Sequence, residues 1–378
     1  MIHNRKRKLS QASAHLAITR IADSSFSPES PTYPPVVISR IRLPLLLGGL
    51  LSLALSSICC AREQADPAKI RKAVTAGLRI LEKGTINYAA QRNCFTCHHQ
   101  TLPMLAQVTA RDHGFKINGK LLQEQARFTH ESFSFRHATL RKGNGIGGRS
   151  MTVGFACWAL HLADWKPDET TGAMVEYLLK SQQKDGNYFT NQSRPPLEDS
   201  PATSVTIATY YQQEFATREQ EDRVKVSATK ALAWLLAYNP TRQEDFSSRL
   251  WGLHLLGAAQ EDIATARTLV LAAQRKDGGW AQLPKMPTDS YATGQALWIL
   301  QATGLPTNDP AYRHGVQFLL HSQRVDGSWL VKTRSKAIQK HFESGFPHGK
   351  DQFISVCGTS WAVAALAATQ LPPEHSSP

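Results

Sequence analysis

The segment NCFTCHHQTLP at residues 93–103 contains two cysteines separated by two residues and followed directly by a histidine. This C-x-x-C-H pattern is the attachment signature of c-type haem, in which two thiols bond to the haem and an imidazole binds its iron. We therefore expect haem c to be attached at Cys94 and Cys97, with His98 as the proximal iron ligand. Several residues are open candidates for the distal ligand: Met104, Met151, His113, His130 and His137.

Two other chemistries fit the same segment. Cys94 and Cys97 are close enough in sequence to form a disulfide clip or to act as a redox pair. His99 extends the pattern to C-x-x-C-H-H, which offers two thiolates and two imidazoles to a metal ion, although adjacent histidines rarely face one ion together. No pattern of a small cytochrome c domain surrounds the segment, so a different fold has to position these residues.

The first 61 residues have the composition of a targeting segment. The basic run RKRK at 5–8 precedes the apolar run 43–61, which ends in small residues and two cysteines. This order is typical of a secretory signal peptide, so we expect export with cleavage after Ala61, or an uncleaved membrane anchor. The protein is then periplasmic or membrane-associated, which suits haem c because its attachment in bacteria follows export. We expect a linker at 62–69 and a tail at 372–378.

The distribution of charge argues against a nucleic-acid partner. The formal net charge is +13, but the basic residues beyond residue 61 form no dense run. A mildly basic surface without a concentrated patch gives little electrostatic reason to bind nucleic acid.

Three segments share the pattern Gln-x-x-Asp-Gly-x-aromatic after an apolar run at helical spacing. They are YLLKSQQKDGNY at 177–188, VLAAQRKDGGW at 270–280 and FLLHSQRVDGSW at 318–329, and a degenerate copy is expected at 234–247. The glycine is suited to end a helix in the left-handed conformation. The glutamine amide is expected to reach the end of a neighbouring helix.

Helical segments alternate along the rest of the chain. Two pairs precede the first repeat, 70–83 with 97–110 and 121–133 with 151–165. Each repeat is followed by a segment rich in small and apolar residues: 201–211, 290–304 and 358–370. About six helical hairpins without strand-like alternation predict one all-α domain at 70–371, closed into a double-layered ring.

The copy RHGVQFLLHSQRVDGSW at 313–329 resembles the QW repeat of squalene-hopene cyclases. The resemblance covers residues 70–370. It implies the α/α toroid that these terpenoid cyclases share with protein prenyltransferase β-subunits. It also implies a central cavity for a hydrophobic, isoprenoid-like ligand.

The same resemblance makes Asp289 a candidate catalytic acid. The segment PTDSYATG at 287–294 lies where the cyclases carry D-x-D-D-T-A, but Pro287 and Ser290 replace the flanking acids. Protonating an alkene needs a strongly acidic carboxyl, and Asp289 lacks the paired carboxylates that would tune it. Because EDSPAT around Asp199 repeats the pattern, a helix-start role is favoured for both aspartates.

The prenyltransferase branch implies a zinc ion held by Asp, Cys and His. The segment 341–361 offers His341, His348, Asp351 and Cys357, but nothing in their spacing requires them to converge. A polar loop followed by a buried thiol is the favoured interpretation. The G-x-G-x-x-G pattern at 143–148 has helical sequence on both sides and predicts a hairpin loop rather than a nucleotide site.

Tryptophans on the inner helices are candidates for the cavity wall. Trp158, Trp298 and Trp361 can steady a carbocation through their π faces, or can simply fill the core. The expected function is therefore an exported toroid that binds or transforms a hydrophobic ligand. The alternatives are a periplasmic haem c protein with a redox partner, and a non-catalytic binding module.

Overall fold

The computed structural model describes residues 65–190, 194–336 and 341–370. The predicted signal peptide or anchor at 1–61 and the predicted tail at 372–378 lie outside these residues. Within the described ranges, no helix has the length and apolar character needed to cross a membrane. The first helix begins at Pro67 rather than at residue 70, because Asp66 accepts a hydrogen bond from the Ala68 amide and caps it.

The described part of the chain is helical, without strands, and its long helices form two layers. The outer layer consists of α2 (Pro67–Gln91), α4 (Gly119–Ser134), α7 (Glu169–Ser181), α10 (Glu221–Ala237), α12 (Gln260–Ala272) and α14 (Pro310–Ser322). The inner layer consists of α3 (Leu102–Asp112), α6 (Arg149–Leu162), α8 (Pro201–Tyr210), α11 (Gln243–Leu255), α13 (Ser290–Ala302) and α15 (Gln352–Ala367). Shorter helical segments connect them: η1 (Cys97–Thr101), α5 (His137–Lys142), α9 (Gln212–Phe215), η2 (Arg218–Gln220) and η3 (Gly349–Asp351).

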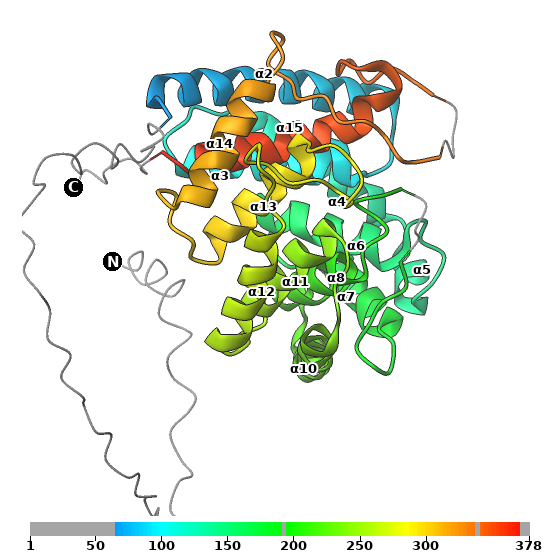
Figure 1. Cartoon of the computed structure of the whole chain (residues 1–378). Coiled ribbons are helices and arrows are strands. Elements are labelled where there is room, and N and C mark those ends of the chain that lie inside the picture. The colour runs from blue at the N-terminus through cyan, green and yellow to red at the C-terminus, as the bar shows by residue number, and fades with distance from the viewer. Residues whose placement is uncertain (1–64, 191–193, 337–340, 371–378) are drawn as a thin grey trace, which may run out of the picture. The chain divides into compact units, whose positions relative to one another are not determined.

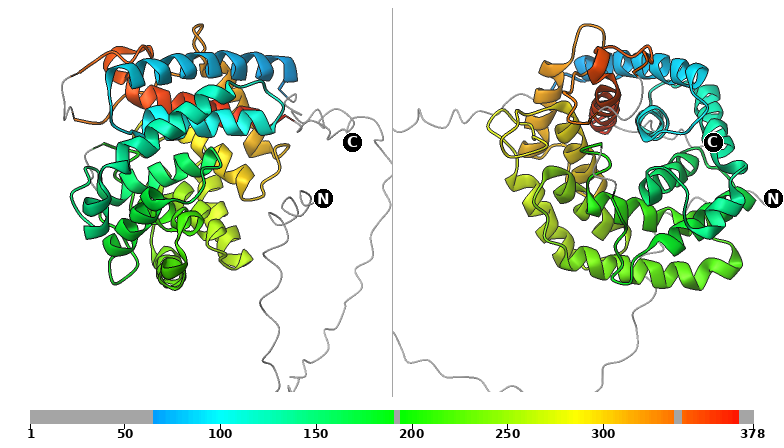
Figure 2. Two further views of the ribbon diagram at one scale, coloured as in Figure 1. Left: turned by 180° about the vertical axis from the view of Figure 1, so that it is seen from behind. Right: turned by 90° about the vertical axis from the view of Figure 1, so that its right-hand side faces the viewer.

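The inner helices close into a ring. Each contacts the next along the chain, and α15 returns to contact α3, while α14 contacts α2 in the outer layer. Figure 1 labels the helices, and the right-hand view of Figure 2 looks down the axis of the ring. The inner helices are buried on almost every side, whereas the outer helices expose one face. This confirms the α/α toroid of about six helical hairpins.

A recurring turn joins consecutive outer helices, and we call it the repeat turn. In the last copy, Gln323 Nε2 donates to the Gly327 carbonyl of its own turn at 3.0 Å and to the Ala73 carbonyl of α2 at 2.9 Å. Gln182 and Gln274 make the same pair of bonds, reaching Ser227 of α10 and Ala311 of α14. The glutamine therefore bridges to the next outer helix as predicted, although Ala73 and Ser227 lie inside their helices rather than at the expected end.

In two copies a tryptophan fastens the repeat turn to the outer helix that precedes it. Trp329 is fully buried, and its indole Nε1 donates to the Leu319 carbonyl of α14 at 2.8 Å. Trp280 bonds Val270 of α12 in the same way at 2.7 Å. These bonds are made to carbonyls in the last turn of each helix, where the amide four residues further on is no longer part of the helix.

The degenerate copy uses a different device. No Gln-Asp-Gly follows α10, but Arg249 of α11 donates to the Leu235 and Leu236 carbonyls at 2.7 and 3.1 Å. A guanidinium therefore bonds the C-terminal carbonyls of this outer helix, as the tryptophan indole does in the last two copies.

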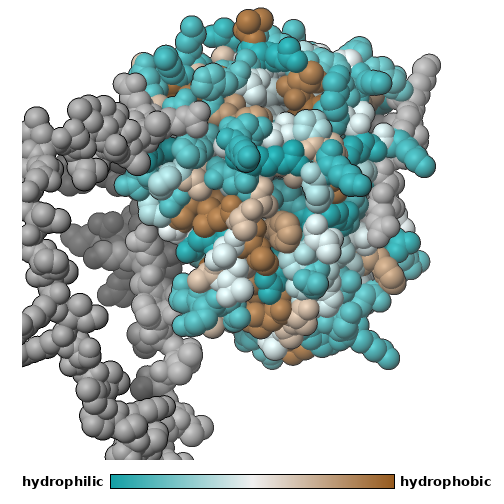
Figure 3. All heavy atoms as spheres, viewed as in Figure 1, coloured by the Kyte–Doolittle hydropathy of each residue, from teal (hydrophilic) through white to brown (hydrophobic). Residues whose placement is uncertain are grey.

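Apolar side chains on the surface are scattered rather than gathered in one patch. Figure 3 shows a largely hydrophilic face with separate apolar areas. The large exposed apolar residues among those described come from several different elements: Ile86, Phe135, Phe189, Val226, Leu236, Leu269 and Val325. Single exposed residues of this kind are common and indicate no docking site.

The repeat turn predicts a difference between two glycine variants. Gly327 and Gly257 both have positive φ, at +91° and +74°, but a Cβ at Gly327 would lie 2.7 Å from the Ala76 carbonyl oxygen, whereas Gly257 has open space. We expect Gly257→Ala to lower the free energy of unfolding by about 1 kcal/mol, and Gly327→Ala by at least about twice that. Urea unfolding measures both, and equal losses would contradict the role of the turn in ring closure.

Candidate functional site

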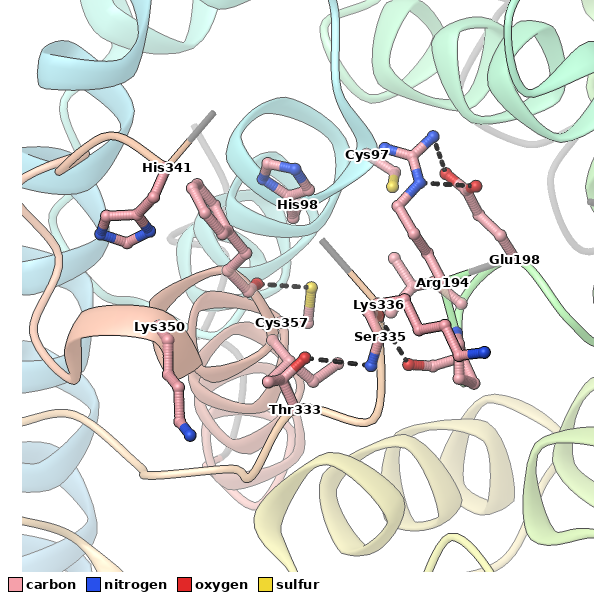
Figure 4. Close-up of a pocket in the computed structure, with 14 residues that line it drawn as sticks. Cys97, His98, Arg194, Glu198, Thr333, Ser335, Lys336, His341, Lys350 and Cys357 are labelled. Atoms are coloured by element: carbon pink, nitrogen blue, oxygen red, sulfur yellow. Dashed lines mark hydrogen bonds and ion pairs between the residues drawn. The ribbon is translucent and has the colours of Figure 1, made fainter. Parts of the chain in front are cut away.

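A cavity with largely apolar walls opens at the N-terminal ends of the inner helices, and we call it the outer cavity (Figure 4). Its volume is about 360 Å³. Its walls come from η1, from the loops at 194–198 and 333–336, from His341 and from the start of α15. Four apolar side chains form much of the lining: Pro195, Leu197, Phe353 and Ile354. The cavity therefore combines the first and last hairpins of the ring with loops from the middle.

Cationic side chains surround this apolar lining. Lys336 and Lys350 are exposed and line the cavity. Arg194 also lines it, but two of its nitrogens lie 2.8 Å from the Glu198 carboxylate. The two lysines can extend their apolar stems along a ligand while their charges stay in water.

The structure brings several of the predicted residues to this cavity. Cys97, His98, His341 and Cys357 line it, whereas Cys94 does not. None of the five predicted distal ligands lines it. His113 bonds the Gln370 carbonyl, His130 and His137 contact acidic partners, and Met104 and Met151 are fully buried.

His98 faces the cavity as a neutral imidazole. The segment CHHQT forms a π-helical turn before α3, and Thr96 caps it by accepting from the His99 amide. His98 Nδ1 lies 2.5 Å from His99 Nδ1, and the His99 ring stacks on Tyr88. Burial, with the neighbouring His99, holds the pKa of His98 well below its ordinary value. Burial also lowers the pKa of His99 to about 3.

The cavity cysteines are protonated thiols. Burial raises the pKa of Cys97 to about 12 and that of Cys357 well above its ordinary value. Since the thiolate is the nucleophilic form, neither is suited to nucleophilic attack. The four cysteines of the described ranges are free, and Cys94 is exposed with its sulfur 3.6 Å from the Tyr88 hydroxyl.

The structure gives no support to the metal hypotheses. In residues 65–190, 194–336 and 341–370, no group of three or more His, Cys, Asp or Glu side chains could hold a metal ion. In the segment 341–361, His348 bonds Ser328, and Asp351 pairs with Lys332. These contacts agree with a polar loop followed by a buried thiol.

Asp289 caps an inner helix and lies outside the outer cavity. Its Oδ1 accepts from the Ala292 amide of α13 at 2.9 Å, and its Oδ2 accepts from Gln282 at 3.0 Å. Burial raises its pKa to about 6, opposed by these hydrogen bonds. Asp199 is the residue that matches Asp289 in the repeated pattern, but the cap of α8 is Ser200. The expected helix-start role of Asp199 is therefore wrong. Asp199 pairs instead with Arg242 at 2.8 Å.

The tryptophans pack against one another at the centre of the ring. The Trp158 ring centroid lies 4.8 Å from that of Trp251, and Trp298 lies 5.5 Å from Trp361. Trp158 and Trp361 border only a small enclosed space of about 10 Å³, which we call the inner space, and Trp298 borders neither hollow. The expected cavity wall is therefore mostly core packing.

The inner space contains a carboxyl that the sequence analysis missed. Glu244, at the start of α11, is only 4% exposed. Its carboxyl accepts from the Thr203 hydroxyl at 2.8 Å and from Gln295 Nε2 at 3.0 Å. Burial raises its pKa to about 7, opposed by these hydrogen bonds. The weak signal in the sequence is Glu244-Asp245, two acids at the start of a helix that the repeat period places in the inner layer.

Solved structures with a similar fold come from different enzyme classes. The type II terpene cyclase MstE from Scytonema aligns with a TM-score of 0.50 and 15% identity, over 81% of this chain and 100% of that chain. A glycosidase aligns with a TM-score of 0.55 and 9% identity, and a glycosidase in complex with glucose with 0.54 and 10%, each over 81% of this chain and 98% of the other. At these identities the likeness shows the fold alone. No family model and no curated protein matches the chain.

The neutral state of Glu244 predicts a pH-dependent effect of Glu244→Gln. Because the folded-state pKa of about 7 lies above the ordinary 4.5, the bound proton stabilises the fold fully below pH 4.5, and this contribution is lost as the pH rises through 7. The Glu244→Gln variant lacks this dependence. Between pH 4.5 and 8 we therefore expect the difference in unfolding free energy, variant minus wild type, to rise by up to about 3 kcal/mol. Urea unfolding across this range measures the gain.

Glu131→Gln is the matched control, since Glu131 is exposed. Its stability relative to wild type should stay constant over the same range. A constant difference for Glu244→Gln as well would show that Glu244 is ionised in the folded protein.

Proposed function

We propose that this chain is an exported toroid protein that binds or transforms a hydrophobic, isoprenoid-like ligand in the outer cavity. The observation that carries the proposal is an open hollow of about 360 Å³ with apolar walls, beside a ring centre that is otherwise packed with tryptophans. Ligand sites are typically concave and mostly apolar, with few polar groups. A type II terpene cyclase has a similar fold, and so does a glycosidase in complex with glucose, so it is the apolar lining that favours a terpenoid over a sugar.

The geometry favours binding over alkene protonation by Asp289. An acid whose pKa is raised by burial is a weak acid, and both Asp289 oxygens already accept hydrogen bonds. Asp289 therefore remains a capping residue in this proposal. Any transformation of the ligand would begin at another group.

Ligand retention by purified protein tests the proposal. After incubation with a membrane lipid extract supplemented with geranylgeraniol, the re-isolated protein should retain an isoprenoid that mass spectrometry detects. Ile354→Trp fills the cavity wall at α15 and should reduce retention at least about tenfold. Leu269→Trp, on the exposed face of α12, should leave it unchanged.

Each result of this experiment has a clear meaning. Retention without a new product supports a binding module, and a changed product supports an enzyme. Absence of any retained isoprenoid, or equal retention by both tryptophan variants, overturns the proposal.

A second function, a c-type haem redox protein, is favoured by one specific observation. His98 is a neutral imidazole on the wall of the outer cavity, beside Cys97, and a neutral imidazole is the form that binds iron. The exposed lysines 336 and 350 suit the carboxylates of a haem. In this function Cys94 and Cys97 would hold the haem, His98 would bind its iron, and the haem would supply one-electron transfer.

A haem spectrum and an intact mass test this second function. Exported protein should give a pyridine haemochrome and gain the mass of one haem over the chain cleaved after Ala61. Cys97→Ser should prevent stable attachment, whereas Cys357→Ser, at a thiol on the same cavity but outside the motif, should retain it. Protein of unmodified mass without a haem spectrum would exclude the haem.

A further inference from the structure

The inner space lies directly below the outer cavity. Leu197 lines both, so the two hollows adjoin at this side chain. The inner space has a volume of about 10 Å³, which is the room that one water-sized group needs. Its walls combine tryptophan rings with the polar side chains of α8, α11 and α13.

Two buried polar atoms on these walls have no hydrogen-bond partner among the described residues. They are Gln295 Oε1, an acceptor, and Trp361 Nε1, a donor. Both side chains are 3% exposed and line the inner space. Leaving such groups unpaired in a protein interior is costly, so the pair is suited to a third group that accepts from the indole and donates to the amide.

Glu244 completes the set. Thr203 and Gln295 both donate to its carboxyl, so neither of them needs the proton that a neutral carboxyl carries. The Tyr291 hydroxyl donates to the same carboxyl, so the proton of the neutral carboxyl is available to another acceptor oxygen. Ser248 lies 2.7 Å from Thr203 and extends the chain of hydroxyls behind the carboxyl.

We propose that the inner space is a hydroxyl-binding site that takes the hydroxyl group of an isoprenoid alcohol. The hydrocarbon chain lies in the outer cavity and the hydroxyl passes Leu197. The hydroxyl oxygen accepts hydrogen bonds from the Glu244 carboxyl and from Trp361 Nε1, and the hydroxyl group donates a hydrogen bond to Gln295 Oε1. This inference rests on the proposed function, and it selects alcohols over hydrocarbons as the ligand class.

A comparison of two ligands that differ by one group tests the proposal. Geranylgeraniol and the hydrocarbon of the same chain without the hydroxyl are titrated at pH 6, where Glu244 is neutral, with tryptophan fluorescence as the readout. Wild type should bind the alcohol at least about tenfold more tightly, since the hydrocarbon leaves the polar groups unpaired. Glu244→Gln keeps an amide donor at this site and should retain most of the preference.

Gln295→Leu provides the decisive variant. It removes the acceptor of the hydroxyl proton, so the preference should fall to about twofold or less while hydrocarbon affinity is kept. Gln107→Leu is the matched control. Gln107 is a fully buried inner-helix glutamine whose amide is also unpartnered among the described residues, but it lies outside the inner space. This control should keep the full preference.

The outcomes separate this inference from the proposed function. If wild type binds both ligands equally, the proposed hydroxyl-binding site is wrong, but the proposal of a hydrophobic ligand in the outer cavity is unaffected. If the preference survives in Gln295→Leu, the hydroxyl lies elsewhere and the inference is also wrong. If neither ligand binds, the proposed function fails and the inference fails with it.

Discussion

The site depends on the closure of the ring, in which the last helix α15 packs against α2 and α3 and a repeat turn bonds the first helix. Gln323 of the last repeat turn donates to the Ala73 carbonyl of the first helix, across most of the folded chain. Only a closed ring places Cys97 and His98 of the first hairpin on the same cavity as Cys357 of the last. The repeat turns are therefore more than a fold signature, because ring closure sets the distance between the residues that could do chemistry.

Burial then decides which protonation states those residues have. The interior lowers the pKa of His98 and raises the pKa of Cys97 and Glu244. Each shift favours the neutral form, because the interior solvates a charge poorly. The ring centre is thus a collection of neutral donors and acceptors beside aromatic rings, which is compatible with an apolar ligand and unsuited to thiolate chemistry.

The repeat turns were predictable from sequence because their determinants are local. Gly327 needs positive φ, and Gln323 lies at a fixed spacing before it. The site was less predictable. The outer cavity depends on loops such as 194–198, whose place over the ring follows only from the assembled fold. Glu244 reads as an ordinary first-turn acid, and its burial depends on how tightly α8, α11 and α13 pack around it.

The structural neighbours share the ring but come from different enzyme classes. Terpene cyclases and glycosidases have this fold, so the scaffold itself selects no reaction. In this chain, the buried carboxyls of Asp289 and Glu244 have pKa values raised by burial and hydrogen bonds that hold them in place. A carboxyl of this kind is a poor donor to carbon and a good hydrogen-bond donor to oxygen, as a buried neutral carboxylic acid can be. Within the proposed function, these carboxyls therefore favour an oxygen-bearing ligand over an alkene that needs protonation.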